Sequence, residues 1–401
     1  MALYIQHGHG KSDKITAALD DGAIDGVIFG ARNEKPDKLR VYIKELRNVS
    51  EDCVLLLDPQ FYVSTLNPPN DRYLPEYPYY SPGRTATSFT SGRSVRRYVK
   101  ETLDCQVELG VDRLVSPTVI FDLFSDRWHQ IALNLADASL EYHAGLSDPP
   151  PLLLSFVFAE EALAGINDIN RFLDTITQDN WDMEGFYFIV GRNDPSYNQC
   201  FDSERLANFL YLVYALGQIN GLRVICGYTD FVGILLRAAG AEAFATGWSQ
   251  SLRQFDQRSF ISRKSGGQPA RERYSSSPLL NSVLLTELQT VYEVGYLTNV
   301  LSGVPLDDAI TSAADPLASD WTRALSQQQH WQTLAVLDET LSGRVRNDLR
   351  EIVRRLENAS GLYAILQGGS VQFGRYTDGR HLPEWVEAIQ TFRRMAGFAS
   401  P

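Results

Sequence analysis

The decisive stretch is Leu152–Phe158 (LLLSFVF), which is followed after one helical segment by Gly185–Val190 (GFYFIV). Both runs are apolar and rich in the residue types that favour strands. Further runs of this kind alternate with helical segments on either side: Ala2–Gln6, Gly26–Gly30, Cys53–Leu57, Arg113–Ser116, Arg223–Cys226 and Ala243–Thr246. This repeated strand–helix pattern predicts an α/β fold, a parallel (β/α)8 TIM barrel over residues 1–255.

Two segments break the repeat. Residues 63–93 form a long loop rich in Pro and Tyr, and loops of that length are commonly functional lids or disordered segments. The density of tyrosines favours an ordered flap. Residues 258–278 combine Arg and Lys with glycines and serines, which predicts a flexible basic loop.

The rest of the chain is predicted to be mainly helical. Helices are expected at Leu279–Leu301, Pro316–Leu341 and Val345–Glu357, and a short strand-like piece at Val371–Tyr376 precedes a final helix. We therefore expect two domains, a TIM barrel at residues 1–255 and a basic loop with a helical C-terminal domain at residues 256–401.

The composition is that of an ordinary soluble globular protein. Of 401 residues, 44% are hydrophobic and 21% charged, and the apolar runs are too short to span a bilayer. The first residues are immediately strand-like, so we expect no signal peptide. Four scattered cysteines without a CxxC pair argue against a zinc ribbon and favour reduced thiols, hence a cytoplasmic location. A net charge of −12 argues against a surface coated for non-specific nucleic-acid binding, although it is compatible with a local basic cleft.

In a TIM barrel the functional residues lie where the strands end, which directs attention to His7 and His9 after the first strand. An H-x-H at this place opens the metal site of amidohydrolase-type barrels, but that chemistry needs further His and Asp ligands at later strand ends. The later strand ends supply none, so no metal is expected. We predict instead a polar lip that contacts a ligand.

Carboxylates follow two strands. Asp58 ends the third strand after three leucines, and it either receives a donor in the pocket or caps the tight turn at Pro59. Glu160 and Glu161 follow the fifth strand. Adjacent acids do not provide the opposed pair that a glycosidase needs, and a helix N-terminus enriched in Glu is the simpler interpretation.

The last three strand ends carry glycines, an aromatic face and amide groups. These residues are Gly191, Arg192, Asn193, Gly227, Tyr228, Trp248 and Gln250. Such a pocket, with Gln60 beside Asp58, suits a flat polar ligand such as a nucleobase. Trp248 taken alone is equally compatible with a packing residue at the rim.

The order of segments 184–192, 222–228 and 235–244 resembles the last three βα units of tRNA-guanine transglycosylases, which exchange a base in RNA. Leu57–Phe61 is similar to the family's D-S-G-G-F segment, so the resemblance implies base recognition and proton transfer by Asp58. The family's nucleophilic aspartate falls on Ala245, its strand-four aspartate near Pro117 and its strand-five glutamine near Phe158. The family's zinc cluster is also absent. Because an alanine cannot attack, we do not expect the usual covalent base exchange.

Three hypotheses follow. The first is a transglycosylase-like barrel that binds a nucleobase or nucleic acid, either tRNA or DNA, with phosphates contacted by Arg258, Arg263, Lys264, Arg271 and Arg273. The second is a non-catalytic subunit of a larger assembly, with a protein partner. The third is a hydrolase or lyase of another barrel class that uses Asp58 and Glu160. No cofactor and no membrane are expected.

Overall fold

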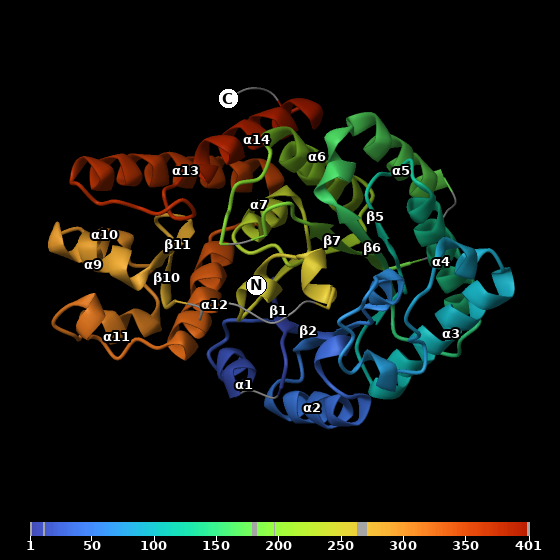
Figure 1. The fold of residues 1–401 in the computed structure, drawn as a ribbon. Coiled ribbons are helices and arrows are strands. Elements are labelled where there is room, and N and C mark those ends of the chain that lie inside the picture. Colours follow the sequence, from blue (N-terminus) through green and yellow to red (C-terminus); the bar gives the residue numbers. More distant parts are fainter. Residues whose placement is uncertain (1, 11–12, 179–182, 196, 263–270, 399–401) are drawn as a thin grey trace.

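The computed structural model describes residues 2–10, 13–178, 183–195, 197–262 and 271–398. Parallel strands form a ring that is nearly closed (Figure 1). In spatial order the ring strands are β3 (Val54–Asp58), β2 (Gly26–Gly30), β1 (Leu3–His7), β9 (Ala243–Gly247), β8 (Arg223–Gly227), β7 (Gly185–Gly191), β6 (Leu152–Ala159) and β4 (Leu114–Val115). A single bridge between Leu56 and Arg113 joins β3 to the start of β4. The predicted TIM barrel is confirmed.

Each predicted strand lies within one residue of the observed one at either end. The short β5 (Ile120–Phe121) is additional, and it pairs with the last residues of β6. Helices surround the ring (Figure 1): α1 (Asp13–Asp20), α2 (Pro36–Val49), α3 (Gly92–Leu109), α4 (Arg127–Ala144), α5 (Ile166–Gln178), α6 (Ser203–Tyr214) with a π-helical end (Ala215–Ile219), and α7 (Val232–Ala239). Strands buried on both faces explain why the apolar runs were so clear in the sequence.

The long loop after β3 is ordered and covers the ends of β2 and β3. It contains short 3-10 turns at Phe61–Thr65, Leu74–Glu76 and Ala86–Phe89. The hydroxyl of the buried Tyr79 donates to the carbonyl of Pro59 at 2.9 Å. Arg84 donates to the carbonyl of Tyr79 at 2.7 Å and lies over the Phe61 ring. These contacts agree with the expectation of an ordered flap.

The C-terminal region begins with a hairpin, not with a helix. Strands β10 (Arg273–Ser276) and β11 (Asn281–Leu284) pair antiparallel, so the prediction of one helix over Leu279–Leu301 was wrong. The same hairpin corrects the flexible loop predicted over residues 258–278, as far as the structure describes that segment. The hairpin's Ser and Asn side chains are buried and hydrogen-bonded, a tertiary effect that the local pattern does not reveal.

Helices make up the remainder of this region: α9 (Leu285–Glu293), α10 (Leu297–Val300), α11 (Asp308–Thr311), α12 (Arg323–Glu339), α13 (Val345–Gly368) and α14 (His381–Met395). The strand-like piece predicted at Val371–Tyr376 is wrong, because these residues are irregular and turn-forming. No helix in the described part of the chain combines the length and apolar character needed to cross a membrane.

Helix α12 takes the place of the eighth barrel helix. Strand β9 is followed by the four-residue helix α8 (Gln250–Arg253), whereas α12 contacts α1, α7 and β1. At its end, the buried Asp338 accepts a hydrogen bond from the Ala2 backbone at 2.8 Å and forms an ion pair with Arg237 at 3.2 Å. Beyond it, α13 packs on α7 and α14 on α6 (Figure 1). The two-domain division at residue 255 stays a prediction.

We expect Asp338→Ala to lower the free energy of unfolding by about 3 kcal/mol, because it leaves a partly buried guanidinium and a buried backbone donor without their partner. Urea denaturation would measure the change. Glu351→Ala is the control, since Glu351 pairs with the exposed Arg354 on α13 and such surface pairs contribute about 1 kcal/mol or less. Equal losses in the two variants would contradict the role given to Asp338.

Candidate functional site

A buried polar cluster lies inside the barrel near the carboxyl ends of β3 and β1, on the side of the functional face of a TIM barrel, and Tyr187 from within β7 completes it. The Asp58 carboxylate accepts hydrogen bonds from the Gln60 backbone at 2.9 Å and from the Tyr62 hydroxyl at 3.1 Å. Across the barrel, the Gln6 side chain donates to the Tyr187 hydroxyl at 2.8 Å. Asp58 therefore caps the turn at its own strand end and also accepts from a hydroxyl of the same loop. Its role toward a ligand stays a prediction.

The glycine at the end of β8 is required by this cluster. A Cβ atom at Gly227 would lie 2.6 Å from the Tyr187 hydroxyl and 2.9 Å from the Gln6 amide nitrogen. The gap predicted at Gly227 is thus occupied by the protein's own side chains. At Gly191 a Cβ would meet only ordinary contacts, the nearest at 3.6 Å.

Three non-glycine residues near the mouth have left-handed backbone conformations. Gln60 has φ 49°, Tyr228 φ 57° and Asp230 φ 50°. This conformation is unfavourable for residues with a side chain and persists where the surrounding structure enforces it, which is common at functional sites. The strain therefore marks the ends of β3 and β8 as the place to look for function.

Residues 254–262, which we call the strap, cross the mouth of the barrel. At one end Phe255 bridges to Gly191 of β7, and its carbonyl accepts from the Arg192 backbone at 3.1 Å. At the other end the Phe260 carbonyl accepts from the Asn70 backbone at 2.8 Å, within the flap. Backbone hydrogen bonds thus fix both ends of the strap.

The strap presses two aromatic rings onto the cluster. Phe255 and Phe260 each contact Tyr62 edge to face at 5.6 Å between ring centroids, and Phe255 also contacts Tyr228 at 5.4 Å. Asp58 is consequently 1% exposed. Burial raises the pKa of Asp58 to about 7, opposed by its hydrogen bonds from Gln60 and Tyr62.

Arg32 is a mouth residue that the sequence analysis missed. It lies two residues after β2, its backbone N–H donates to the Gln60 side-chain oxygen at 2.8 Å, and it stacks on the Phe260 ring at 4.3 Å. Its guanidinium donates to the Ser259 carbonyl of the strap at 2.8 Å and makes a longer bond of 3.4 Å to the Asn70 carbonyl. No carboxylate pairs with it among the described residues, so this cation is held by neutral groups. The signal available in sequence was an Arg two residues beyond a strand ending in Gly30.

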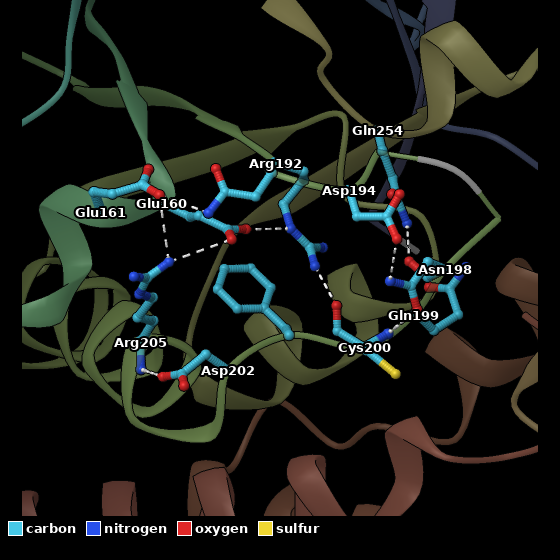
Figure 2. Close-up of polar contacts among 12 residues, drawn as sticks. Glu160, Glu161, Arg192, Asp194, Asn198, Gln199, Cys200, Asp202, Arg205 and Gln254 are labelled. Atoms are coloured by element: carbon cyan, nitrogen blue, oxygen red, sulfur yellow. Dashed lines mark hydrogen bonds and ion pairs between the residues drawn. The ribbon is translucent and has the colours of Figure 1, made fainter.

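Glu160 and Arg192 form a separate group at the ends of β6 and β7 (Figure 2). Arg192 pairs with Glu160 at 2.9 Å, donates to the Cys200 carbonyl and lies over the Phe201 ring. Arg205 holds the other oxygen of Glu160 at 3.3 Å. Asn193 beside them donates to Glu161 at 2.5 Å. Both carboxylate oxygens of Glu160, the predicted catalytic residue, are therefore paired with arginines. The guanidinium of Arg192, the predicted ligand-binding residue, is bonded to Glu160 and to a backbone carbonyl.

His7 and Trp248 lie on the outer side of the barrel wall. The His7 ring packs among Phe29, Tyr42 and Trp248 at 5.3 to 5.5 Å, because alternate residues of β1 face opposite sides. Burial lowers the pKa of His7 to about 3, with a smaller contribution from His9. Trp248 therefore fits the packing alternative.

The remaining predicted residues are dispersed. His9 stacks on Tyr73, outside the cluster, and Gln250 donates to the Pro195 carbonyl at 3.2 Å. Of the predicted phosphate-contacting residues, Arg258 pairs with Asp256 at 2.8 Å, and Arg273 stacks on the Tyr197 ring at 3.8 Å and donates to the Ser282 carbonyl. Arg271 is exposed, and Arg263 and Lys264 lie outside the described residues.

The described part of the chain contains no group of three His, Cys, Asp or Glu side chains arranged to hold a metal ion. The four cysteines are free thiols.

No family model and no curated protein matches this chain. Among solved structures, it is similar to a glycosyl hydrolase of the GH3 family from Mycobacterium smegmatis, with 13% identity and a TM-score of 0.39, over 61% of this chain and 83% of that one. It is also similar to the carboxyl transferase domain of Rhizobium etli pyruvate carboxylase, with 11% identity and a TM-score of 0.36, over 100% of this chain and 62% of that one. Likenesses this low carry no argument about chemistry. The resemblance to tRNA-guanine transglycosylases stays a hypothesis.

We expect Asp58→Asn to change how stability depends on pH. Because the pKa of Asp58 in the folded protein is raised, its contribution to stability is fully present below the ordinary value of 3.8 and is lost as pH rises through about 7. The variant lacks this loss. Between pH 4 and pH 7 its free energy of unfolding should therefore rise relative to that of the wild type by about 3 kcal/mol. Urea denaturation across this range would measure the difference. If the free energy of unfolding depends on pH in the same way in the variant and the wild type, the pKa of Asp58 is not raised in the folded protein.

We expect Glu160→Gln to lower the free energy of unfolding by about 3 kcal/mol, because the buried Arg192 would lose its ionised partner. Ligand binding at the mouth should be unchanged. Asn193→Ala is the control, since it removes only an exposed contact to Glu161. A variant that keeps its stability but loses binding or activity would instead make Glu160 a functional acid.

Proposed function

We propose that the barrel mouth binds a flat polar ligand of the nucleobase type. The observation that carries the proposal is the buried carboxyl group of Asp58, which lies beneath aromatic rings at the functional face of the barrel. Burial raises the pKa of this group to about 7. A carboxyl group whose pKa is raised in this way takes up a proton more readily than an exposed one. It can therefore accept from, or donate to, the edge of a heterocycle.

The neighbours of Asp58 suit the same ligand class. Tyr62 and Tyr228 offer ring faces, and bases stack on such faces without regard to their identity. Gln60 offers an amide for edge recognition. Arg32 offers a planar donor for a carbonyl oxygen or an anionic group.

The proposal concerns binding and proton transfer, not covalent base exchange. Ala245, the position to which the resemblance assigns the nucleophile, is buried in β9 and has no group able to attack. A free base or small conjugate is favoured over a polynucleotide, because Arg258 and Arg273 are engaged within the chain and the net charge is −12.

A non-catalytic subunit is the second candidate function. It is favoured by the packing of Phe255 and Phe260 over Asp58 and by the mutual pairing of Glu160 and Arg192. In that case the barrel would be a scaffold, and a stable complex with a partner protein would form equally well with Asp58→Asn.

The test is a titration of the protein with adenine, hypoxanthine, cytosine and uracil, in which ligand-observed NMR detects binding. A second experiment measures the binding of fluorescently labelled tRNA over a series of salt concentrations. We expect one base class to bind and Asp58→Asn to weaken it by about tenfold or more, the loss of one charge-assisted hydrogen bond. Phe260→Ala should tighten binding, because a ligand must displace the strap and the apparent affinity is reduced by the fraction of closed molecules.

Asp307→Asn is the matched control. Asp307 is a buried carboxylate in the C-terminal region that also accepts from a tyrosine hydroxyl, Tyr274 at 2.8 Å, and from a backbone N–H. Its substitution should leave base binding unchanged. Equal effects of the two Asp→Asn substitutions, or no base binding at all, would refute the proposal. Salt-sensitive tRNA binding that ignores Asp58→Asn would place nucleic-acid recognition elsewhere on the molecule.

A further inference from the structure

Arg253 is a buried cation between the barrel and the C-terminal hairpin. It is the last residue of α8 and is 4% exposed. Its Nη1 makes one long hydrogen bond, of 3.5 Å, to the Ser282 hydroxyl of β11, and its Nε is enclosed without a hydrogen-bond partner. A guanidinium carries five N–H donors, and a buried donor without a partner costs free energy. Within the described part of the chain, most donors of Arg253 therefore lack an acceptor.

A second guanidinium, that of Arg273 in β10, lies beside the first. Both lie over the ring of Tyr197, with Arg273 at 3.8 Å and Arg253 at 5.8 Å from the ring centroid. Burial lowers the pKa of Arg273, and the positive charge of Arg253 acts in the same direction. Arg273 donates from Nη1 to the Ser282 carbonyl at 2.7 Å, which leaves its other N–H groups unused among the described residues. The fold thus holds two like charges together with few hydrogen bonds.

Two carboxylates are close enough to affect the pKa of Arg273, and both are bonded elsewhere. Asp230 accepts from Gln199 at 2.9 Å and lies 3.2 Å from a ring nitrogen of His330. Glu287 accepts from a hydroxyl and from two backbone N–H groups at 2.6 to 2.8 Å. In the part of the chain that the structure describes, no carboxylate forms an ion pair with either arginine. The arginine pair therefore lacks a directly bound counter-charge.

We propose that Arg253 and Arg273 bind a phosphate group between the end of α8 and the C-terminal hairpin. The planar guanidinium donates to phosphate oxygens in a bidentate manner, and a phosphate group carries about two negative charges, which matches the pair. Arg273 and Tyr197 are partly exposed, so an ion from solvent reaches the pair on their side. The group could be free phosphate or a phosphate ester. The site does not depend on the proposed base site at Asp58.

The probe is inorganic phosphate, titrated into the full chain by isothermal calorimetry at constant ionic strength. We expect a Kd of about 1 mM or tighter, and we expect Arg253→Met to weaken binding by about tenfold or more, because it removes one of the two charges. Glycerol 2-phosphate tests the ester. Tighter binding of the ester than of free phosphate would identify an ester as the source, and the reverse order would identify the free ion.

Thermal unfolding separates this role from a structural one. A buried charge without a partner is costly, so in phosphate-free buffer Arg253→Met should have a Tm equal to or above that of the wild type. Phosphate binds only the folded protein, so it should raise the Tm of the wild type but not that of the variant. If Arg253 were only structural, the variant would have a lower Tm in both buffers and phosphate would change neither protein.

Arg354→Met is the matched control, because Arg354 is exposed on α13 and pairs with Glu351. It should leave phosphate binding unchanged, as should Asp58→Asn, so failure of this site and failure of the base site are distinguishable. If Arg253→Met does not fold, Arg273→Gln replaces it and should also weaken binding by about tenfold. No phosphate binding at about 10 mM, an equal rise of the Tm with chloride, or unchanged affinity in these two variants would overturn the proposal.

Discussion

The backbone pairing of the strap at both ends is the constraint on which the barrel mouth depends. Because residue 255 is joined to β7 and residue 260 to the flap, the rings of Phe255 and Phe260 cannot leave the tyrosines beneath them independently. This packing excludes water from Asp58, and loss of hydration is what raises its pKa. The strap also gives Arg32 a carbonyl partner in Ser259. The strap therefore makes two kinds of contact at the mouth that a bound ligand would also make: it packs aromatic rings on the tyrosines and accepts a hydrogen bond from Arg32.

The barrel was predictable because its strands are buried on both faces, so that their apolar composition is set by burial and is local in sequence. The C-terminal hairpin was not predictable for the opposite reason. Ser275, Ser282 and Asn281 have the composition of a loop, and partners distant in the sequence make them suitable for a buried strand, as Gln329 and His330 do for Ser275. Helix α12 was hidden for the same reason, because it completes the outer ring of helices about 75 residues after β9, the strand that it follows in space.

The sequence allowed only those site residues to be predicted that lie at or just after the end of a predicted strand. Asp58, Gln60 and Tyr228 follow their strands directly, so they could be named. Which of two neighbouring residues faces the mouth depends on register, and this is why Gln6 lies in the cluster and His7 on the outer wall. Tyr187 was missed because a tyrosine within an apolar run is indistinguishable in sequence from a core residue. The partners of Glu160 could not be foreseen, since Arg192 and Arg205 meet it only when β6, β7 and α6 are assembled.

The C-terminal region supports the mouth through one buried chain of hydrogen bonds. Burial lowers the pKa of His330 to about 4, and the pKa of Asp230 is about 2 because His330 and Gln199 outweigh the effect of burial. The Nε2 atom of His330 lies 3.2 Å from the Asp230 carboxylate, and its Nδ1 atom lies 2.9 Å from the Ser275 hydroxyl. Asp230 lies two residues beyond Tyr228, and both have strained backbones. Since His330 of α12 and Ser275 of β10 hold the loop that carries Tyr228, the C-terminal region is part of what shapes the mouth.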